Sequence, residues 1–194
     1  MAAAPSERVN DQAFKNSTAL TAQREGIMGA ALARHFGCSL IFNEDPKRRQ
    51  LYDYALFSPE RGFALTCEHQ DEYFTTTMAG QLCLELYTLA KNHKKKGKLL
   101  YTTANRLIYV INNIKKVLII DLSILKKMVV DLEAAGQLET YTPEDHDAWK
   151  EKHDTLPTTC ALVPIEEVLI QAPQTSVITF EELNIPTSYE KLRP

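Results

Sequence analysis

Leu51-Tyr-Asp-Tyr-Ala-Leu-Phe57 and Phe63-Ala-Leu-Thr-Cys-Glu-His-Gln-Asp-Glu72 are two strand-like runs of the chain. The segment Ser58-Pro-Glu-Arg-Gly62 joins them and has the residues of a hairpin turn. We therefore expect antiparallel strands over residues 51–57 and 62–68. This hairpin decides the fold, because the remaining elements must pack around it.

Polar side chains in the hairpin form a pattern of their own. Alternate residues of a strand face the same way, so Glu68 and Gln70 share a face, and Glu72 joins them if the strand continues. Across the turn, Asp53 is expected beside Glu68. Two carboxylates with a nearby backbone carbonyl suit a hard cation such as Mg²⁺ or Mn²⁺. Such an ion polarises a phosphoryl oxygen and activates water.

Further elements flank the hairpin on both sides. A helix is expected from Ser17 or Thr18 to about Phe36, followed by a strand at 39–42. Downstream, the pattern predicts strands at 81–87, 106–111, 116–121 and 159–163, a loop at 91–98, a helix at 124–135 capped by Ser123, and a short helix after Pro164. The order predicts one α/β domain over residues 16–194, with a mixed central sheet flanked by helices, after a flexible segment at residues 1–15.

Composition sets modest limits on function. The 194 residues carry 22 basic and 25 acidic side chains, a formal charge of −3, so nucleic-acid binding would need a local basic patch. The four cysteines have no metal-site spacing, which favours a reduced, intracellular protein. The N-terminus has no apolar signal region, and no apolar run is long enough to span a bilayer.

Several motifs along the chain resemble those of one enzyme family. They are Arg24-Glu25 in the first helix, Asp53, Glu68-His-Gln-Asp-Glu72, Ala79-Gly-Gln-Leu-Cys-Leu-Glu85 and Thr102-Thr-Ala-Asn-Arg-Leu-Ile-Tyr109. Their order resembles that of the PD-(D/E)XK nuclease superfamily, in particular its small phage and bacterial members. The motifs depart from that pattern, most clearly where Gln70 stands in place of Lys.

The resemblance implies a restriction-endonuclease-like fold and a Mg²⁺-dependent DNA endonuclease. Asp53 and Glu68 would hold the metal, Gln70 would orient water or phosphate, and Glu25 would assist. Some members use Glu-x-Gln and remain active. Glu85 matches the last acid of the pattern and is expected at the periphery of the site. A phage-encoded protein would act in the host cytoplasm.

Two basic runs are candidates for DNA contact. Lys47, Arg48 and Arg49 precede the Asp53 strand, and Lys94, Lys95 and Lys96 form the densest positive segment. Either run would make DNA binding sensitive to salt, although such runs are usually solvated loops.

Two other classes of function stay open. The chain could be a nuclease-like protein without catalysis that binds DNA or protein as an inhibitor. It could also be an interaction domain whose acids are merely solvated. A homodimer and a protein partner are compatible with each of these functions.

Overall fold

A six-stranded mixed sheet forms the centre of the protein. The computed structural model describes residues 5–45, 51–72, 80–90, 93–142 and 158–192. The order of strands across the sheet is β1 (Ser39–Phe42), β2 (Tyr54–Ser58), β3 (Phe63–Glu72), β6 (Arg106–Ile111), β7 (Lys116–Asp121) and β10 (Ser176–Thr179). The predicted α/β class with a mixed sheet flanked by helices is confirmed.

The hairpin that opens the sheet pairs as expected. β1, β2 and β3 form an antiparallel meander, with Tyr54 opposite Cys67. β6 then runs parallel to β3, with Leu107 opposite Glu68, and continues into the antiparallel β6–β7 hairpin. β3 is longer than predicted and reaches Glu72, whereas β2 begins only at Tyr54. Asp53 therefore lies just before β2 rather than inside it.

A second, antiparallel sheet packs beside the first. Its order is β5 (His93–Lys96), β4 (Gln81–Ala90), β9 (Thr158–Pro164) and β8 (Glu139–Tyr141). The expectation of a loop at 91–98 was wrong, because this segment contains β5 and the start of the four-residue helix α2 (Lys98–Tyr101). Exposed lysines are common on edge strands such as β5, so a charged run does not exclude a strand.

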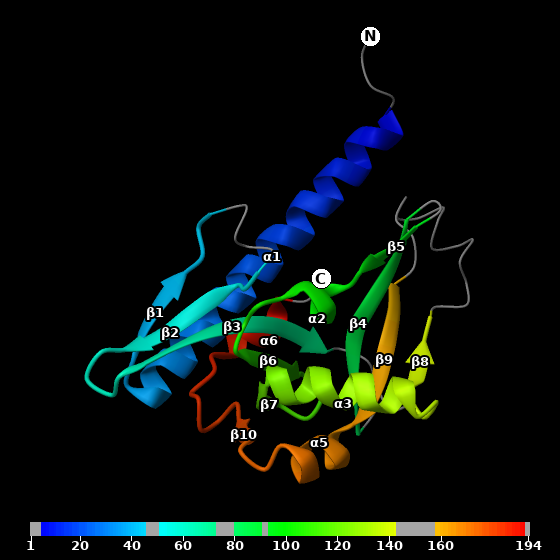
Figure 1. Cartoon of the computed structure of the whole chain (residues 1–194). Helices are drawn as coiled ribbons and strands as arrows, with labels where there is room; N and C mark the ends of the chain where they lie inside the picture. The colour runs from blue at the N-terminus through cyan, green and yellow to red at the C-terminus, as the bar shows by residue number, and fades with distance from the viewer. Residues whose placement is uncertain (1–4, 46–50, 73–79, 91–92, 143–157, 193–194) are drawn as a thin grey trace.

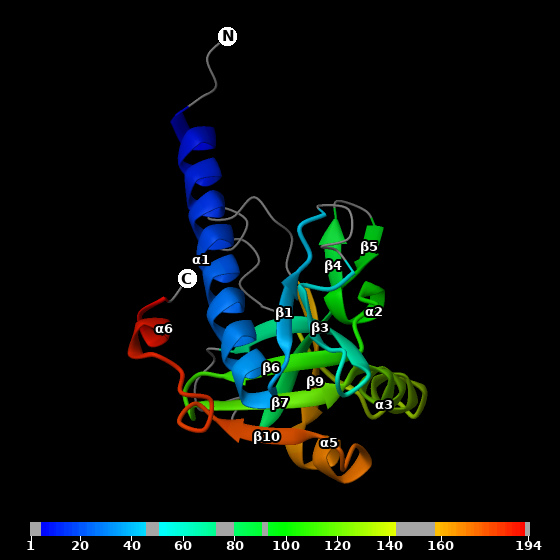
Figure 2. The ribbon, with the colours of Figure 1, turned by 90° about the vertical axis from the view of Figure 1, so that its left-hand side faces the viewer.

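Helices cover the two faces of the six-stranded sheet. α1 (Pro5–Phe36) lies on one face and α3 (Leu122–Ala134) on the other, as Figures 1 and 2 show. The short helices α5 (Ile165–Gln171) and α6 (Thr187–Lys191) lie near the C-terminus. The residues of β6 are buried on both sides: Leu107 and Tyr109 enter the core shared with α3 and β4, while Ile108 and Val110 enter the core shared with α1.

Two helix ends differ from the sequence prediction. α1 begins at Pro5 rather than at Ser17 or Thr18, since the polar stretch from Pro5 contains no helix breaker and proline suits the first position. The N-cap of α3 is Asp121 rather than Ser123, because the Asp121 carboxylate accepts hydrogen bonds from the backbone amides of Ser123 and Ile124.

No helix in the described ranges is long and apolar enough to cross a membrane.

A buried polar network ties the C-terminal segment to α1 and β3. The Arg24 guanidinium donates to both oxygens of Asp71, to Asn112 Oδ1, and to the carbonyl oxygens of Tyr189 and Leu192. Its Cζ lies 3.8 Å from the centre of the Tyr189 ring. Asp71 therefore belongs to the α1 face of β3, as strand alternation predicts, and Glu68 faces the opposite way.

Candidate functional site

Asp53 and Glu68 meet where β2 begins beside β3. The Asp53 amide donates to the carbonyl oxygen of Cys67 at 2.9 Å, and its carboxylate Oδ2 accepts from the amide of His69 at 2.7 Å. These two hydrogen bonds hold Asp53 against β3, one at the residue before Glu68 and the other at the residue after it. The juxtaposition that the hairpin predicts is therefore present in the structure.

The Lys98 side chain, from the first residue of α2, joins the two acids. Its Nζ forms an ion pair with Glu68 Oε1 and lies 3.4 Å from Asp53 Oδ2. It also donates to the carbonyl oxygen of His69 at 3.5 Å. One ammonium thus sits among three oxygens, two from carboxylates and one from the β3 backbone.

Gly97 determines where the backbone of Lys98 lies. The Gly97 amide donates to the carbonyl oxygen of Leu86 in β4 at 2.5 Å. A Cβ at this position would lie 2.6 Å from the Glu85 carbonyl oxygen, closer than any ordinary contact. Only glycine allows the chain to approach β4 so closely, and this approach directs Lys98 toward β3.

Thr102 supports the far side of the Glu68 carboxyl group. Its hydroxyl lies 2.9 Å from Glu68 Oε2 and 2.7 Å from the carbonyl oxygen of Leu51, and its single proton can serve only one of them at a time. Lys126 from α3 donates to the carbonyl oxygen of Thr102, which places a second cation nearby. Glu68 is only 3% exposed, so these neighbours replace its water.

The charges of the cluster change its proton affinities. Desolvation alone would lower the pKa of Lys98, but the carboxylates of Glu68 and Asp53 outweigh it and raise that pKa above its ordinary value. Burial raises the pKa of Glu68 to about 8; Lys98 opposes this change and the Asp53 charge adds to it. Lys98 therefore stays an ammonium, and Glu68 holds its proton more tightly than an ordinary carboxyl group does.

Glu25 lies in α1. It is half-buried, and its charge is among the smaller contributions that raise the pKa of Lys98, after those of Glu68 and Asp53. The Glu25 charge therefore acts on the Lys98 ammonium, but less strongly than the two carboxylates beside it. Glu25, Asp53 and Glu68 come from three separate elements of the chain.

Gln70 shares the face of Glu68 but has a different partner. Its side-chain Nε2 donates to the carbonyl oxygen of Cys83 in β4 at 2.5 Å. The amide of Cys83 in turn donates to the Tyr109 hydroxyl at 2.9 Å. At this point the backbone of β4 is thus held by two side chains of the first sheet, which gives Gln70 a role in joining the sheets.

The other two acids of the motif series lie in different sheets, Glu72 in β3 and Glu85 in β4. Glu72 is buried and its Oε2 accepts from the Tyr109 hydroxyl at 2.7 Å. Glu85 is half-buried in β4, opposite Cys160 in β9. Burial raises the pKa of Tyr101, Lys98 opposes this change, and the charges of Glu68 and Glu85 add to it.

The predicted DNA-contacting residues are described only in part. Lys95 and Lys96 are exposed on β5, three and two residues before Lys98. The side chain of Lys94 lies outside the described part of the structure, and so do Lys47, Arg48 and Arg49 altogether. Exposed positive charge therefore precedes α2 directly.

The cluster has the oxygen ligands of a hard-cation site, with fewer acidic side chains than many such sites. Within the described residues, no three His, Cys, Asp or Glu side chains lie close enough together to hold a metal ion. A metal here would take the two carboxylates of Asp53 and Glu68, the His69 carbonyl and water, a donor set that Mg²⁺ accepts. The ammonium of Lys98 already marks the point where these three oxygens converge.

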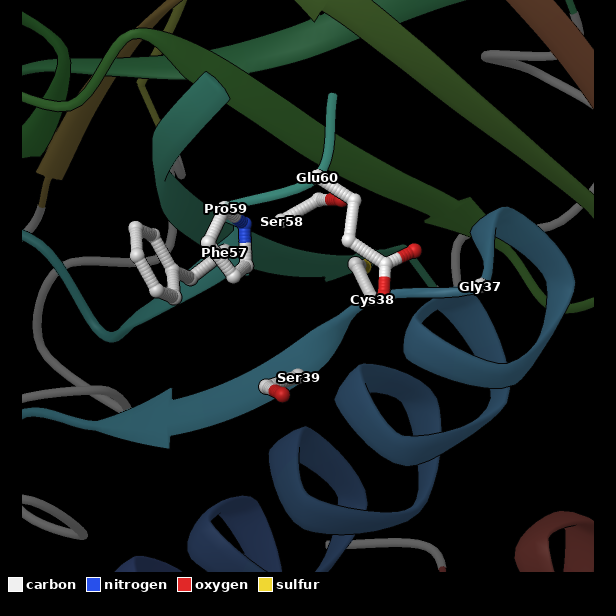
Figure 3. A pocket seen from close by; sticks show the side chains of 7 residues that line it. All are labelled: Gly37, Cys38, Ser39, Phe57, Ser58, Pro59 and Glu60. Atoms are coloured by element: carbon white, nitrogen blue, oxygen red, sulfur yellow. The ribbon is translucent and has the colours of Figure 1, made fainter. Parts of the chain in front are cut away.

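A pocket of about 310 Å³ lies away from this cluster. It is lined by residues 37–39 and 57–60, between the end of α1 and the β2–β3 turn, as Figure 3 shows. Asp53 is at the opposite end of β2. None of the predicted site residues that the structure describes lines this pocket.

Comparisons with protein-family models, with curated proteins and with solved structures found no match to this chain. The function must therefore be inferred from the site itself. Sequence reasoning missed Lys98 and Thr102 as members of the site. The signal available for Lys98 was a glycine between a basic run and an apolar segment. Thr102 stood in a motif that was quoted for the family resemblance, but the residue was given no role in the site.

Proposed function

We propose that this protein is a metal-dependent DNA nuclease that hydrolyses phosphodiester bonds. The observation that carries the proposal is the convergence of Asp53, Glu68 and the His69 carbonyl on a single cation, the ammonium of Lys98. The order of motifs along the chain and the mixed sheet that carries the two acids support a restriction-endonuclease-like fold.

Each residue of the cluster has a distinct task in this mechanism. Asp53, Glu68 and the His69 carbonyl would hold Mg²⁺ or Mn²⁺, which polarises a phosphoryl oxygen and lowers the pKa of water. Lys98 would stabilise the negative charge that develops on the phosphate. It thereby supplies the positive charge that Gln70 cannot. Glu25 would assist, and Thr102 would orient Glu68.

The surroundings of the cluster suit a polyanionic substrate. The side chain of Lys98 is 33% exposed, whereas that of Glu68 is buried. Lys95 and Lys96 extend positive charge along β5 from this point. We expect these lysines to contact phosphates without reading the base sequence, since phosphate contacts carry no sequence information.

Cleavage of supercoiled plasmid and of labelled DNA and RNA oligonucleotides in Mg²⁺ or Mn²⁺ tests this function. Asp53→Asn, Glu68→Gln and Lys98→Met should each lower the rate by about 10²-fold or more, as loss of a charge-stabilising group typically does. Glu133→Gln, an exposed acid of α3, should cleave like wild type. Wild-type rates in Glu68→Gln would refute the proposal.

A second function is favoured by one observation, the presence of a lysine where a metal would bind. If Lys98 holds that position permanently, the protein is a nuclease-like factor that binds DNA or protein without cutting. A gel-shift measurement with wild type in EDTA and in Mg²⁺ separates the two. Binding in both conditions with no cleavage in either metal would favour the inactive factor.

A further inference from the structure

The Lys98 ammonium occupies the point that a divalent cation would need. It contacts Asp53 Oδ2 at 3.4 Å, Glu68 Oε1 through an ion pair, and the His69 carbonyl oxygen at 3.5 Å. Mg²⁺ requires oxygens at about 2.0–2.1 Å. An ion coordinated by these oxygens would overlap the ammonium and repel its charge, so the two cations exclude each other.

We propose that Lys98 is a tethered competitor of the divalent metal, which must leave the oxygens of Asp53, Glu68 and His69 before a metal can bind there. This inference rests on the proposed function in assigning those oxygens as metal ligands. It adds a regulatory property of the same site: the protein neutralises its own acids until metal is present.

The local structure permits Lys98 to move without unfolding its surroundings. The backbone is held by Gly97, whose amide donates to Leu86 and whose α-carbon packs against β4. The side chain is partly exposed and has a flexible four-carbon stem. Rotation about that stem can carry the ammonium toward solvent while α2 remains in place.

Displacement also links metal binding to substrate binding. Once released, the ammonium lies next to the metal-binding oxygens, within the length of one side chain, where a bound phosphate would attract it. A phosphate that holds Lys98 away from Asp53 and Glu68 would raise the affinity for metal. By thermodynamic reciprocity, metal would raise the affinity for the phosphate by the same factor.

Isothermal titration of metal-free protein with Mn²⁺ tests the competition directly. Lys98→Met should bind Mn²⁺ at least tenfold more tightly than wild type, because the competing charge is gone. Lys98→Gln, which keeps a polar partner for Glu68, should behave similarly and guards against misfolding of the first variant. Lys98→Arg keeps the competing charge and should bind weakly. Lys127→Met, which removes an exposed lysine of α3 that pairs with Asp131, should match wild type.

The possible results separate this inference from the proposed function. Tighter Mn²⁺ binding by Lys98→Met than by wild type supports the competition. If Lys98→Met binds Mn²⁺ and wild type binds none, the competition still stands but the nuclease proposal fails. If both neutral variants bind Mn²⁺ no more tightly than wild type, the competition is overturned. The nuclease proposal survives that result as long as wild type binds the metal. Absence of binding in all variants overturns both.

A second measurement tests the link to substrate. Titration is repeated in the presence of a short phosphorothioate oligonucleotide, which resists cleavage. The oligonucleotide should tighten Mn²⁺ binding by wild type more than by Lys98→Met, since only wild type has an ammonium to hold away. An equal effect on both would overturn the link. Lys98→Met should nevertheless cleave DNA more slowly than wild type, so its metal affinity and activity move in opposite directions.

Discussion

Arg24 in α1 and Asp71 in β3 form a bidentate ion pair, with nitrogen–oxygen distances of 2.7 and 2.8 Å. Arg24 is only 2% exposed, and the hydrogen bonds from Arg24 and His69 lower the pKa of Asp71 well below its usual range despite burial. Arg24→Met should lower the free energy of unfolding by about 3–5 kcal/mol, because it leaves the Asp71 charge buried without its main partner. Urea unfolding followed by circular dichroism measures the loss.

A second ion pair to the C-terminal segment provides the control for this prediction. Lys115 and Glu190 pair at 3.0 Å, with side chains 57% and 41% exposed. Glu190→Gln should change stability by less than about 1 kcal/mol, as exposed pairs usually do. Equal losses in Arg24→Met and Glu190→Gln would contradict the special role of the buried pair. Arg24→Met should also expose the C-terminal segment to carboxypeptidase, whereas Glu190→Gln should not.

The raised pKa of Glu68 predicts how stability depends on pH. Because its folded-state pKa of about 8 lies above the ordinary value of 4.5, the folded state holds the proton more tightly than the unfolded state. The stabilisation is complete below about pH 4.5 and is lost as pH rises through about 8. A tenfold difference in proton affinity between the folded and unfolded states corresponds to about 1.4 kcal/mol of stability.

Chemical unfolding in EDTA at pH 5 and at pH 8.5 checks this prediction. Glu68→Gln stays neutral, so it lacks the pH-dependent loss, and its stability relative to wild type should rise by more than about 1 kcal/mol between the two pH values. Glu133→Gln should show no such difference. A constant gap between wild type and Glu68→Gln would mean that Glu68 is ionised throughout.

The close packing of Gly97 on β4 leads to a prediction about the contact between α2 and β4. Gly97→Ala would place a Cβ 2.6 Å from the Glu85 carbonyl oxygen, so α2 must shift and carry Lys98 away from Glu68. We expect a loss of about 1–3 kcal/mol, as overpacking typically causes, together with a lower cleavage rate. Thermal unfolding and the plasmid assay measure these two effects.

Gly26 in α1 is the matched control for that substitution. An added Cβ there would meet only Phe42 Cζ at 3.8 Å, an ordinary contact. Gly26→Ala should therefore stabilise the protein by up to about 1 kcal/mol, because alanine favours the helix. If Gly97→Ala were as stable as Gly26→Ala, the close approach of α2 to β4 could not be what positions Lys98.

Local patterns predicted the half of the cluster that comes from one hairpin. Strand alternation placed Glu68 and Asp71 on opposite faces of β3, and the turn at 58–62 brought Asp53 beside Glu68. The boundaries of β6 and β7 also agree with the sequence prediction. These features depend on neighbours within a few residues or across one turn, where hydrophobic period and turn chemistry carry the information.

The other half of the cluster depends on contacts between separate sheets. Lys98 is thirty positions beyond Glu68 and reaches it only because β4 packs across β3 and Gly97 packs on β4. A four-residue helix is too short to show a helical period, so α2 has no pattern to read. The partner of Gln70 was hidden for the same reason, because nothing in its own strand indicates that β4 lies above it.

Placing a lysine at position 70 in place of the one at position 98 tests whether cleavage needs only a positive charge or needs that charge to come from α2. In a Lys98→Met background, Gln70→Lys should restore part of the lost cleavage, because the face it shares with Glu68 allows its ammonium to reach a bound phosphate. In wild type, Gln70→Lys should add little, since Lys98 already provides that charge. Initial rates of plasmid cleavage in Mn²⁺ measure both effects.

The control separates charge from packing at the same position. Gln70→Met in the Lys98→Met background has a similar volume but neither a charge nor a donor for the Cys83 carbonyl, so it should restore nothing. It should also lower stability by about 1 kcal/mol, the usual net worth of one hydrogen bond. Recovery in both double variants would show that relief of packing restores cleavage. Recovery in neither, with both proteins folded, would show that the site needs its lysine from α2.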